Sequence, residues 1–239
     1  ANLRAVGVTV WDRDPDTGKQ IRFTACDGHF ALSLDGIGEG FKESKQLHTL
    51  EFKTMNDKNF KALQKDGLEK SKPVYYAQCQ IGMHLADIDR CAFIAVNKND
   101  DSIYMERVKR DHAIGMQLVA KAESIIFSDK PPARLNADPS FYLCRFCDYR
   151  HVCHEGKPPL VNCRTCAQST VERGGDGKWS CAAGHAFGTA CNEHLFNPYA
   201  MPLEVYDAGP GWVEYTTQDG EVIRNEGNSP DIASAWVPF

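Results

Sequence analysis

The sequence lacks an apolar run long enough to cross a membrane, and its first residues are too polar for a signal peptide. We therefore expect a cytoplasmic protein. Long low-complexity segments and internal repeats are also missing, and 42% hydrophobic and 25% charged residues are ordinary for a globular protein. A basic surplus is absent, since 27 lysines and arginines face 32 aspartates and glutamates, for a net charge of -5. This argues against a protein that coats DNA broadly, but it allows a local basic patch.

Cysteine is scarce before residue 140, where Cys26, Cys79 and Cys91 each lie in an element that favours a small buried thiol. The other seven of the ten cysteines lie between Cys144 and Cys191. This change predicts three parts, namely a main domain at 1–140, a cysteine-rich metal-binding module at 141–200, and a hairpin and tail at 201–239.

Apolar periodicity in the main domain predicts an α+β fold with a mixed central sheet flanked by helices. Strands are expected at 5–11, 21–26, 30–34, around Glu51, at 90–97 and at 102–108. Helices are expected at 59–64, 72–85 and 111–127. Residues 211–224 read as a hairpin, and the tail from 225 to 239 is expected to be irregular.

Two carboxylates and a lysine stand out in this domain. Asp35 follows the apolar residues of a strand, and Glu51, Phe52 and Lys53 lie on a neighbouring strand. Strand alternation places Glu51 and Lys53 on one face and Phe52 on the other. Two acidic groups can hold a hard divalent cation, and an adjacent ammonium can orient a water or offset phosphate charge. The pattern is typical of phosphodiester hydrolysis, although a solvated hairpin with ordinary surface charges has the same composition.

These residues resemble the motif of the PD-(D/E)XK nuclease superfamily, in particular RecB-like and YqaJ-like exonucleases of phages and bacteria. Asp35 matches the motif aspartate, Glu51 the second acidic residue and Lys53 the lysine. The resemblance covers residues 1 to about 155. It implies a restriction-endonuclease-like core that binds Mg²⁺ or Mn²⁺ through Asp35, Glu51 and the Phe52 carbonyl.

The same resemblance implies DNA as the substrate and a role in recombination or repair, with a recombination protein as a possible partner. The setting it implies is the cytoplasm of a bacterium or of a phage-infected host. RecB-like nucleases have helices before the first strand, and this sequence starts almost at the strand, so those helices are expected to be missing.

The helix expected at 72–85 extends the resemblance. RecB-like nucleases carry a glutamine there and a tyrosine four residues later, both facing the active site. Gln78 matches the glutamine and is implied as a further catalytic residue, whereas Gly82 stands where the tyrosine is usual. From the residues alone, Gln78 can equally be a surface amide.

Lysines follow the motif lysine closely along the chain. They can contact a phosphate backbone, and we expect Lys61, Lys65 and Lys72 to bind DNA. The alternative is a solvated helix face.

The cysteine-rich region begins with Cys144, Cys147, Cys153 and His154. The three cysteines resemble the C-terminal triplet of iron–sulfur RecB-like nucleases, whose fourth cysteine comes from upstream of the core. No cysteine precedes the first strand here, so zinc with His154 or a later cysteine as fourth ligand closes the set more simply.

A second group reads as a zinc ribbon or finger. The two groups together contain two CxxC pairs, with further Cys and His residues within a short span, which is a strong signal of metal binding. Its expected ligands are Cys163, Cys166, Cys181 and Cys191, with His194 and His185 as competitors. We expect two zinc ions, with an iron–sulfur cluster as the alternative at the first group. The spacing also allows a cross-braced pairing of the two groups, or a disulfide framework in place of metal.

Two functions fit the sequence. The first is a metal-dependent DNA nuclease, expected to be an exonuclease, whose zinc module stabilises the core or grips DNA. The second is a catalytically silent, zinc-containing module on a nuclease-like fold that binds nucleic acid or protein. Gly82 and the negative net charge favour the second function.

Overall fold

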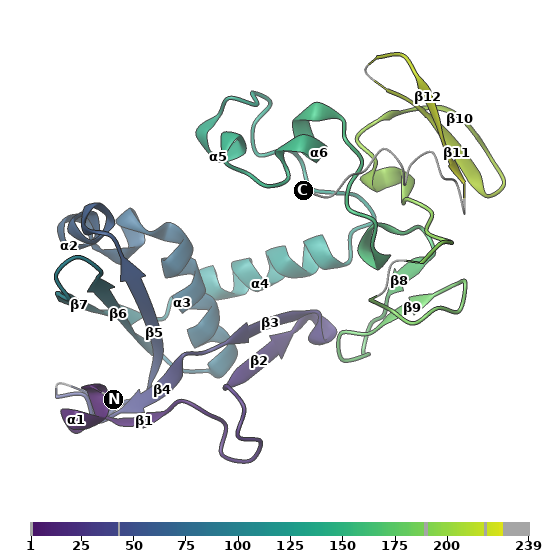
Figure 1. The fold of residues 1–239 in the computed structure, drawn as a ribbon. Helices are drawn as coiled ribbons and strands as arrows, with labels where there is room; N and C mark the ends of the chain where they lie inside the picture. The colour runs from purple at the N-terminus through teal and green to yellow at the C-terminus, as the bar shows by residue number, and fades with distance from the viewer. Residues whose placement is uncertain (1, 43, 189–190, 218, 227–239) are drawn as a thin grey trace. The chain divides into compact units, whose positions relative to one another are not determined.

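Figure 1 shows the fold as a computed structural model, which describes residues 2–42, 44–188, 191–217 and 219–226. The chain forms two compact units, residues 1–126 and residues 127–239. The boundary expected near residue 140 lies within the second unit. Within the described residues, no helix has the length and apolar character needed to cross a membrane.

The first unit is built on a five-stranded mixed sheet in the order β1-β4-β5-β6-β7. Strand β5 runs parallel to β6, and the other neighbouring pairs are antiparallel. The strands are β1 (Thr9–Trp11), β4 (Gly36–Glu39), β5 (His48–Met55), β6 (Arg90–Asn97) and β7 (Ile103–Lys109). The expected α+β class with a mixed, helix-flanked sheet is confirmed.

The long helices of this unit are α2 (Asp57–Ser71), α3 (Pro73–Ala86) and α4 (His112–Ile126). Helices α2 and α3 form the crossover that the parallel pair β5–β6 requires. The Asn56 side chain caps α2 by accepting the Asn59 N–H at 2.9 Å. Apolar side chains of α2 and α3 pack on one face of β5, β6 and β7. This core consists of Met55, Phe60, Leu63, Leu68, Cys79, Met83, Cys91, Phe93, Ala95 and Val108.

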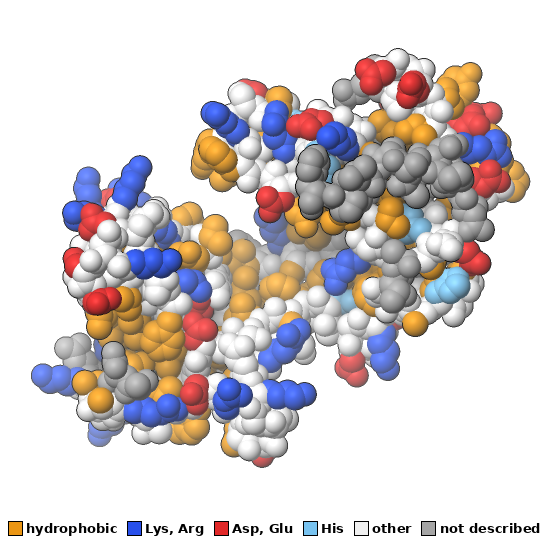
Figure 2. Space-filling model, in the orientation of Figure 1, with side chains coloured by type: hydrophobic (Ala, Val, Ile, Leu, Met, Phe, Trp, Pro, Cys, Tyr) orange, Lys and Arg blue, Asp and Glu red, His pale blue; other side chains and the backbone are white. Residues whose placement is uncertain are grey.

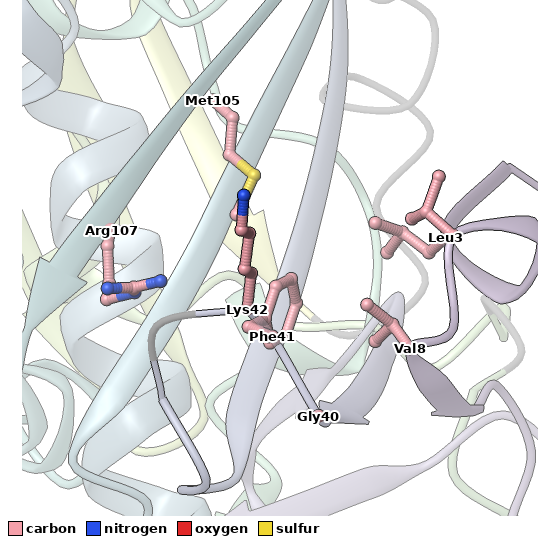
Figure 3. A pocket seen from close by; sticks show the side chains of 8 residues that line it. Leu3, Val8, Gly40, Phe41, Lys42, Met105 and Arg107 are labelled. Carbon is pink, nitrogen blue, oxygen red and sulfur yellow. The ribbon is translucent and has the colours of Figure 1, made fainter.

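The opposite face of the sheet carries a smaller apolar cluster of Val8, Phe41, Leu50 and Ala92. Short helix α1 (Asn2–Ala5) precedes β1. A hollow of about 710 Å³ lies at this face, and Figure 3 shows the apolar side chains and the two basic residues that line it.

A separate antiparallel pair, β2 (Arg22–Ala25) and β3 (Phe30–Ser33), leads into β4. The turn between them is the 3-10 helix η1 (Cys26–Gly28), in which Asp27 has a left-handed φ of 55°. Helix α3 packs against this hairpin, so that α3 contacts the central sheet and the hairpin together.

The second unit has short helices and two small sheets. Its helices are α5 (Tyr142–Arg145), α6 (Arg150–Glu155), η2 (Cys163–Thr165) and η3 (Pro198–Ala200). Its strands are β8 (Ser169–Val171), β9 (Trp179–Cys181), β10 (Glu204–Gly209), β11 (Trp212–Thr216) and β12 (Val222–Glu226). Phe196, Met201 and Tyr215 form its core. The buried Asn225 side chain accepts the Phe196 N–H at 3.1 Å and donates to the Phe196 carbonyl at 2.8 Å.

Several expected elements differ from those observed. The strand expected at 5–11 is shorter, because Ala5 is the last residue of a helix and β1 begins at Thr9. Helix α2 is longer than the expected 59–64, and strands β4, β8, β9 and β10 were not predicted. Asn225 and Glu226 extend β12 into the segment expected to be irregular, and residues 227–239 of that segment lie outside the described part.

Candidate functional site

Asp35 lies at the entry to β4, where the chain leaves the β2–β3 hairpin and joins the central sheet. Its Oδ2 accepts the backbone N–H of Phe52 at 2.8 Å, which holds the carboxylate beside β5. The next residue has no room for a side chain, because a Cβ on Gly36 would lie 2.9 Å from the carbonyl oxygen of Trp11. The Asp35-Gly36 sequence therefore brings the Asp35 carboxylate close to the backbone of β5.

Glu51 and Lys53 project from β5 toward the helix-covered face, and Phe52 projects to the other face. Only 4% of Glu51 is exposed, compared with 43% of Phe52, as the alternation predicts. The Lys53 ammonium contacts Oε1 of Glu51 and lies 5.2 Å from the centroid of the Tyr75 ring on α3. The structure thus brings the expected carboxylates and lysine together where β4 and β5 meet.

Burial dominates the electrostatics of this group. It raises the pKa of Glu51; the Lys53 ammonium lowers that pKa, and the negative charge of Asp35 raises it. The balance is a raised pKa, because one ammonium does not replace the hydration that the carboxylate loses. A divalent cation would offset both the burial and the repulsion. The donors available are two carboxylates and a backbone carbonyl, the hard oxygens that Mg²⁺ and Mn²⁺ prefer, so the residues fit such an ion.

Helix α3 carries the two further positions of the expected motif. Gln78 is half-buried and lies one turn after Tyr75, whose ring faces the motif lysine. Gly82, one turn further, is buried against the hairpin, since a Cβ there would lie 3.1 Å from the side chains of Leu32 and Leu34. A tyrosine at this position would displace the hairpin. This close packing accounts for a glycine at position 82.

The buried Gln80, two residues after Gln78, was not expected from the sequence. Its Nε2 donates to the Lys109 carbonyl at 2.9 Å, and its Oε1 accepts the Asp111 N–H at 2.8 Å. This amide therefore ties α3 to the connection between β7 and α4. In the sequence, the burial of Gln80 is indicated only by its place between apolar residues of a helix. This signal is weak, because polar residues at surface positions of a helix have similar neighbours.

The thiols of the first unit differ in burial. Cys79 and Cys91 are 2% and 1% exposed, which confirms the expected burial, whereas Cys26 is half-buried. A hydrogen bond with Cys91, together with burial, raises the pKa of Cys79. Glu51 is close enough for its charge to raise the same pKa. The pairing of these thiols near the carboxylates has no signal in the sequence, since the two lie on different elements.

The lysines expected to bind DNA lie on or just after α2, and Figure 2 shows basic side chains over this helix. The Lys61 ammonium is 2.8 Å from Oδ2 of Asp57, and the Lys72 ammonium donates to Asn59 Oδ1 at 2.7 Å. Lys65 is exposed, without such a contact in the described residues. All three are placed where solvent or a ligand can reach them, and their role in DNA binding stays a prediction.

The second cysteine group gathers around one small cavity in the second unit. Its lining includes every ligand expected for this group, namely Cys163, Cys166, Cys181, Cys191, His185 and His194. His194 Nε2 lies 3.2 Å from the Asn162 carbonyl, and burial lowers the pKa of His194, which favours the neutral imidazole that can bind a metal. His185 Nε2 lies 2.9 Å from Glu193 Oε2. Four thiols with two histidines as competitors are a donor set that suits zinc.

The members of the first cysteine group differ in burial. Cys144 is buried in α5, Cys153 and His154 are half-buried in α6, and Cys147 is exposed between the helices. Across the described residues, no three His, Cys, Asp or Glu side chains are arranged to hold a metal ion. All ten cysteines lie in the described part as free thiols, which contradicts a disulfide framework. Zinc at either group stays a prediction.

Comparisons with known proteins give no family assignment. No family model matches the chain, and no curated protein matches it. Among solved structures, the chain is similar to one described as "Crystal structure of SSO0001", with 18% identity and a TM-score of 0.34. The similarity covers 64% of this chain and 66% of that chain, which is just under two thirds of its length.

Proposed function

We propose that this protein is a metal-dependent nuclease that hydrolyses phosphodiester bonds in DNA. The observation that carries the proposal is a buried carboxylate, Glu51, held beside Asp35 and in contact with Lys53. Burying an acidic side chain whose pKa is raised costs stability. Such an arrangement is typical of a site that is completed by a cation and substrate.

In this proposal, Asp35, Glu51 and the Phe52 carbonyl hold Mg²⁺ or Mn²⁺. A bound cation supplies Lewis-acid chemistry, because it polarises a phosphate and lowers the pKa of a water. Lys53 orients the attacking water and offsets the charge that develops on the phosphate. Its own position is fixed by Glu51 and by the ring of Tyr75. Gln78, on the same side of α3, positions the substrate strand.

The fold implied by this proposal is a restriction-endonuclease-like core in the first unit. The mixed sheet with a helical crossover between β5 and β6 supports it. In the second unit, the thiols around one cavity support a zinc-binding module. The biological role that accompanies this function is exonuclease action in DNA recombination or repair, in a bacterial or phage-infected cell, with a recombination protein as a possible partner.

The test is a cleavage assay on labelled linear DNA, with and without Mg²⁺ or Mn²⁺. Asp35→Ala, Glu51→Ala and Lys53→Ala should each lose the divalent-dependent cleavage, with circular dichroism showing an intact fold. Glu39→Ala is the matched control, because Glu39 is an exposed carboxylate at the far end of β4. Undiminished cleavage in all three variants would contradict the assignment. A wild-type protein that binds DNA and never cuts it would favour the silent binding module.

A further inference from the structure

Large aromatic side chains are exposed on and just after α5 in the second unit. Phe146 is 80% exposed, Tyr142 64% and Tyr149 63%, and Leu143 beside them is 47% exposed. Single exposed apolar residues are common on proteins, but several together mark a binding surface. We call Tyr142, Arg145, Phe146 and Tyr149 the aromatic patch. None of these four is a candidate ligand of the cysteine groups.

Tyr142 and Arg145 lie on α5, and Phe146 follows it directly. Tyr142 and Phe146 are four residues apart, which places them on one side of a helical turn. The Tyr142 ring centroid lies 4.9 Å from that of Phe141, and the Arg145 guanidinium lies 5.7 Å from the centroid of Phe146. Figure 2 shows hydrophobic and basic side chains adjoining over α5. An exposed aromatic ring and a guanidinium group are therefore adjacent on this surface.

The charge of the aromatic patch is available to a ligand. Arg145 is exposed and has no acidic partner within the described part of the chain. Arg150, one turn along, is 3.5 Å from Glu155 and so is partly neutralised. A ligand with both planar apolar faces and regularly spaced anionic groups complements this surface.

We propose that the aromatic patch binds single-stranded nucleic acid by stacking unpaired bases on Phe146 and Tyr142 while Arg145 contacts a phosphate. Unpaired bases expose their faces to solvent and gain from stacking on aromatic rings, whereas the bases of a duplex are already stacked. The proposal rests on the proposed nuclease function for its biological meaning, since it supplies the strand that such an enzyme would hold. Binding itself is measured without cleavage.

A membrane surface fits these observations less well. Helices that lie in a lipid interface present a long apolar face, and α5 has only four residues. A protein partner would use the same rings, and arginine is also common at protein interfaces, but such a partner would not give the surface a preference for an unpaired strand. Membrane and protein binding are therefore outcomes that the experiment separates from strand binding.

The experiment measures fluorescence anisotropy of a labelled oligothymidylate and of a matched duplex, with the full-length protein in buffer without Mg²⁺ or Mn²⁺. Phe146→Ala and Tyr142→Ala should each weaken oligothymidylate binding at least about fivefold, and Phe146→Trp should retain it. Arg145→Gln should lower the slope of log affinity against log salt by about 0.7, the value for one lost phosphate contact on a single strand. Tyr206→Ala is the matched control, because Tyr206 is 67% exposed on β10 and lies outside the aromatic patch.

Metal content and circular dichroism of each variant should equal those of the wild type, so that lost binding is not lost folding. A Tyr142→Ala, Phe146→Ala double variant that binds oligothymidylate as the wild type does would overturn the proposal. Binding to phosphatidylserine vesicles without binding to oligothymidylate would also overturn it. Lys53→Ala should abolish cleavage and leave strand binding intact, so failure of the catalytic assignment is distinct from failure of the aromatic patch.

Discussion

At the scale of single residues, burial of the Glu51 carboxylate is unfavourable and raises its pKa. Its carboxyl group is almost inaccessible to water, and Asp35 adds a like charge nearby. A surface glutamate would have neither feature. The folded, metal-free protein therefore holds the protonated form of Glu51 more easily than the unfolded chain does, because the pKa is raised in the fold.

Glu51→Gln should alter how stability depends on pH in the metal-free protein. In the wild type, the free energy of unfolding falls as pH rises from the ordinary value of 4.5 through the raised pKa of Glu51, since the folded state then binds more protons than the unfolded one. A difference of one pKa unit between the folded and unfolded states changes the free energy of unfolding by about 1.4 kcal/mol. The variant should lack this decline, so its advantage over the wild type grows across that window. Urea unfolding at a series of pH values measures the difference.

Magnesium provides the control for this linkage. Adding Mg²⁺ at neutral pH should raise the melting temperature of the wild type, because an ion that binds only the folded state stabilises it by mass action. The Glu51→Gln variant should show a smaller rise. If the difference in free energy of unfolding between the wild type and Glu51→Gln stays constant from acid to neutral pH, ionised Glu51 does not destabilise the fold.

Much of this residue-level arrangement could be predicted. The alternation in Glu51-Phe52-Lys53 assigned the faces of β5, because the period of a strand is fixed by backbone geometry. The approach of Asp35 to the Phe52 N–H could not be derived in the same way, since it depends on how β4 pairs with β5. The reason for Gly82 was also hidden, because it lies in the side chains of a distant hairpin.

At the scale of elements, α3 has two glutamines with different surroundings. Gln80 is fully buried, and both ends of its amide pair with the backbone at the β7–α4 connection. Gln78 is half-buried on the side of Tyr75. The helix therefore separates a glutamine that stabilises the fold from one proposed to meet the substrate.

Replacing each glutamine with alanine should separate these roles. Gln80→Ala should lower the free energy of unfolding by about 1–3 kcal/mol for each backbone group left unsatisfied. Gln78→Ala should leave stability within about 0.5 kcal/mol of the wild type, as for most changes outside a core, while reducing DNA cleavage. Chemical unfolding and the cleavage assay on the same preparations measure both. Loss of cleavage without loss of stability in Gln80→Ala would reverse the assignment.

Prediction of whole elements succeeded where local signals were strong. The buried strand expected at 90–97 matches β6, because a continuous apolar run of that length favours a central parallel strand. Strand β4 was missed because Gly36 and Gly38 weaken its strand signal. Both positions need glycine, because a Cβ at either one would collide with neighbouring atoms. The existence of β4 follows from pairing with β1 and β5, which a local pattern does not contain.

At the scale of the whole molecule, the chain divides into two compact units with different means of stabilisation. The first has a continuous apolar core between helices and sheet. The second has a core of three buried residues and, next to β8 and β9, the cavity lined by thiols. The cysteine spacing predicted the thiol gathering, since a CxxC turn directs two sulfurs to one side. The boundary at residue 126 could not be placed, because composition changes later in the chain than the packing does.

Metal removal should therefore affect the two units differently. We expect about two zinc ions per chain in the purified, colourless protein, because closed thiolate sites couple metal binding to folding. Cys166→Ser should lose about one zinc and change the emission of Trp179, whose ring stacks on Phe187 with centroids 5.2 Å apart near the same thiols. Chelation should likewise expose the amides of β8 and β9 to hydrogen exchange, while β5 and β6 stay protected by their own core.

The matched control is Cys26→Ser, since Cys26 is half-buried in the first unit and far in sequence from both groups. It should keep the full zinc content. Iron and sulfide in a brown protein would instead assign a cluster to Cys144, Cys147 and Cys153. Chelation that unfolds both units together would contradict the separate stabilisation, because a metal-dependent second unit should not remove the apolar core of the first.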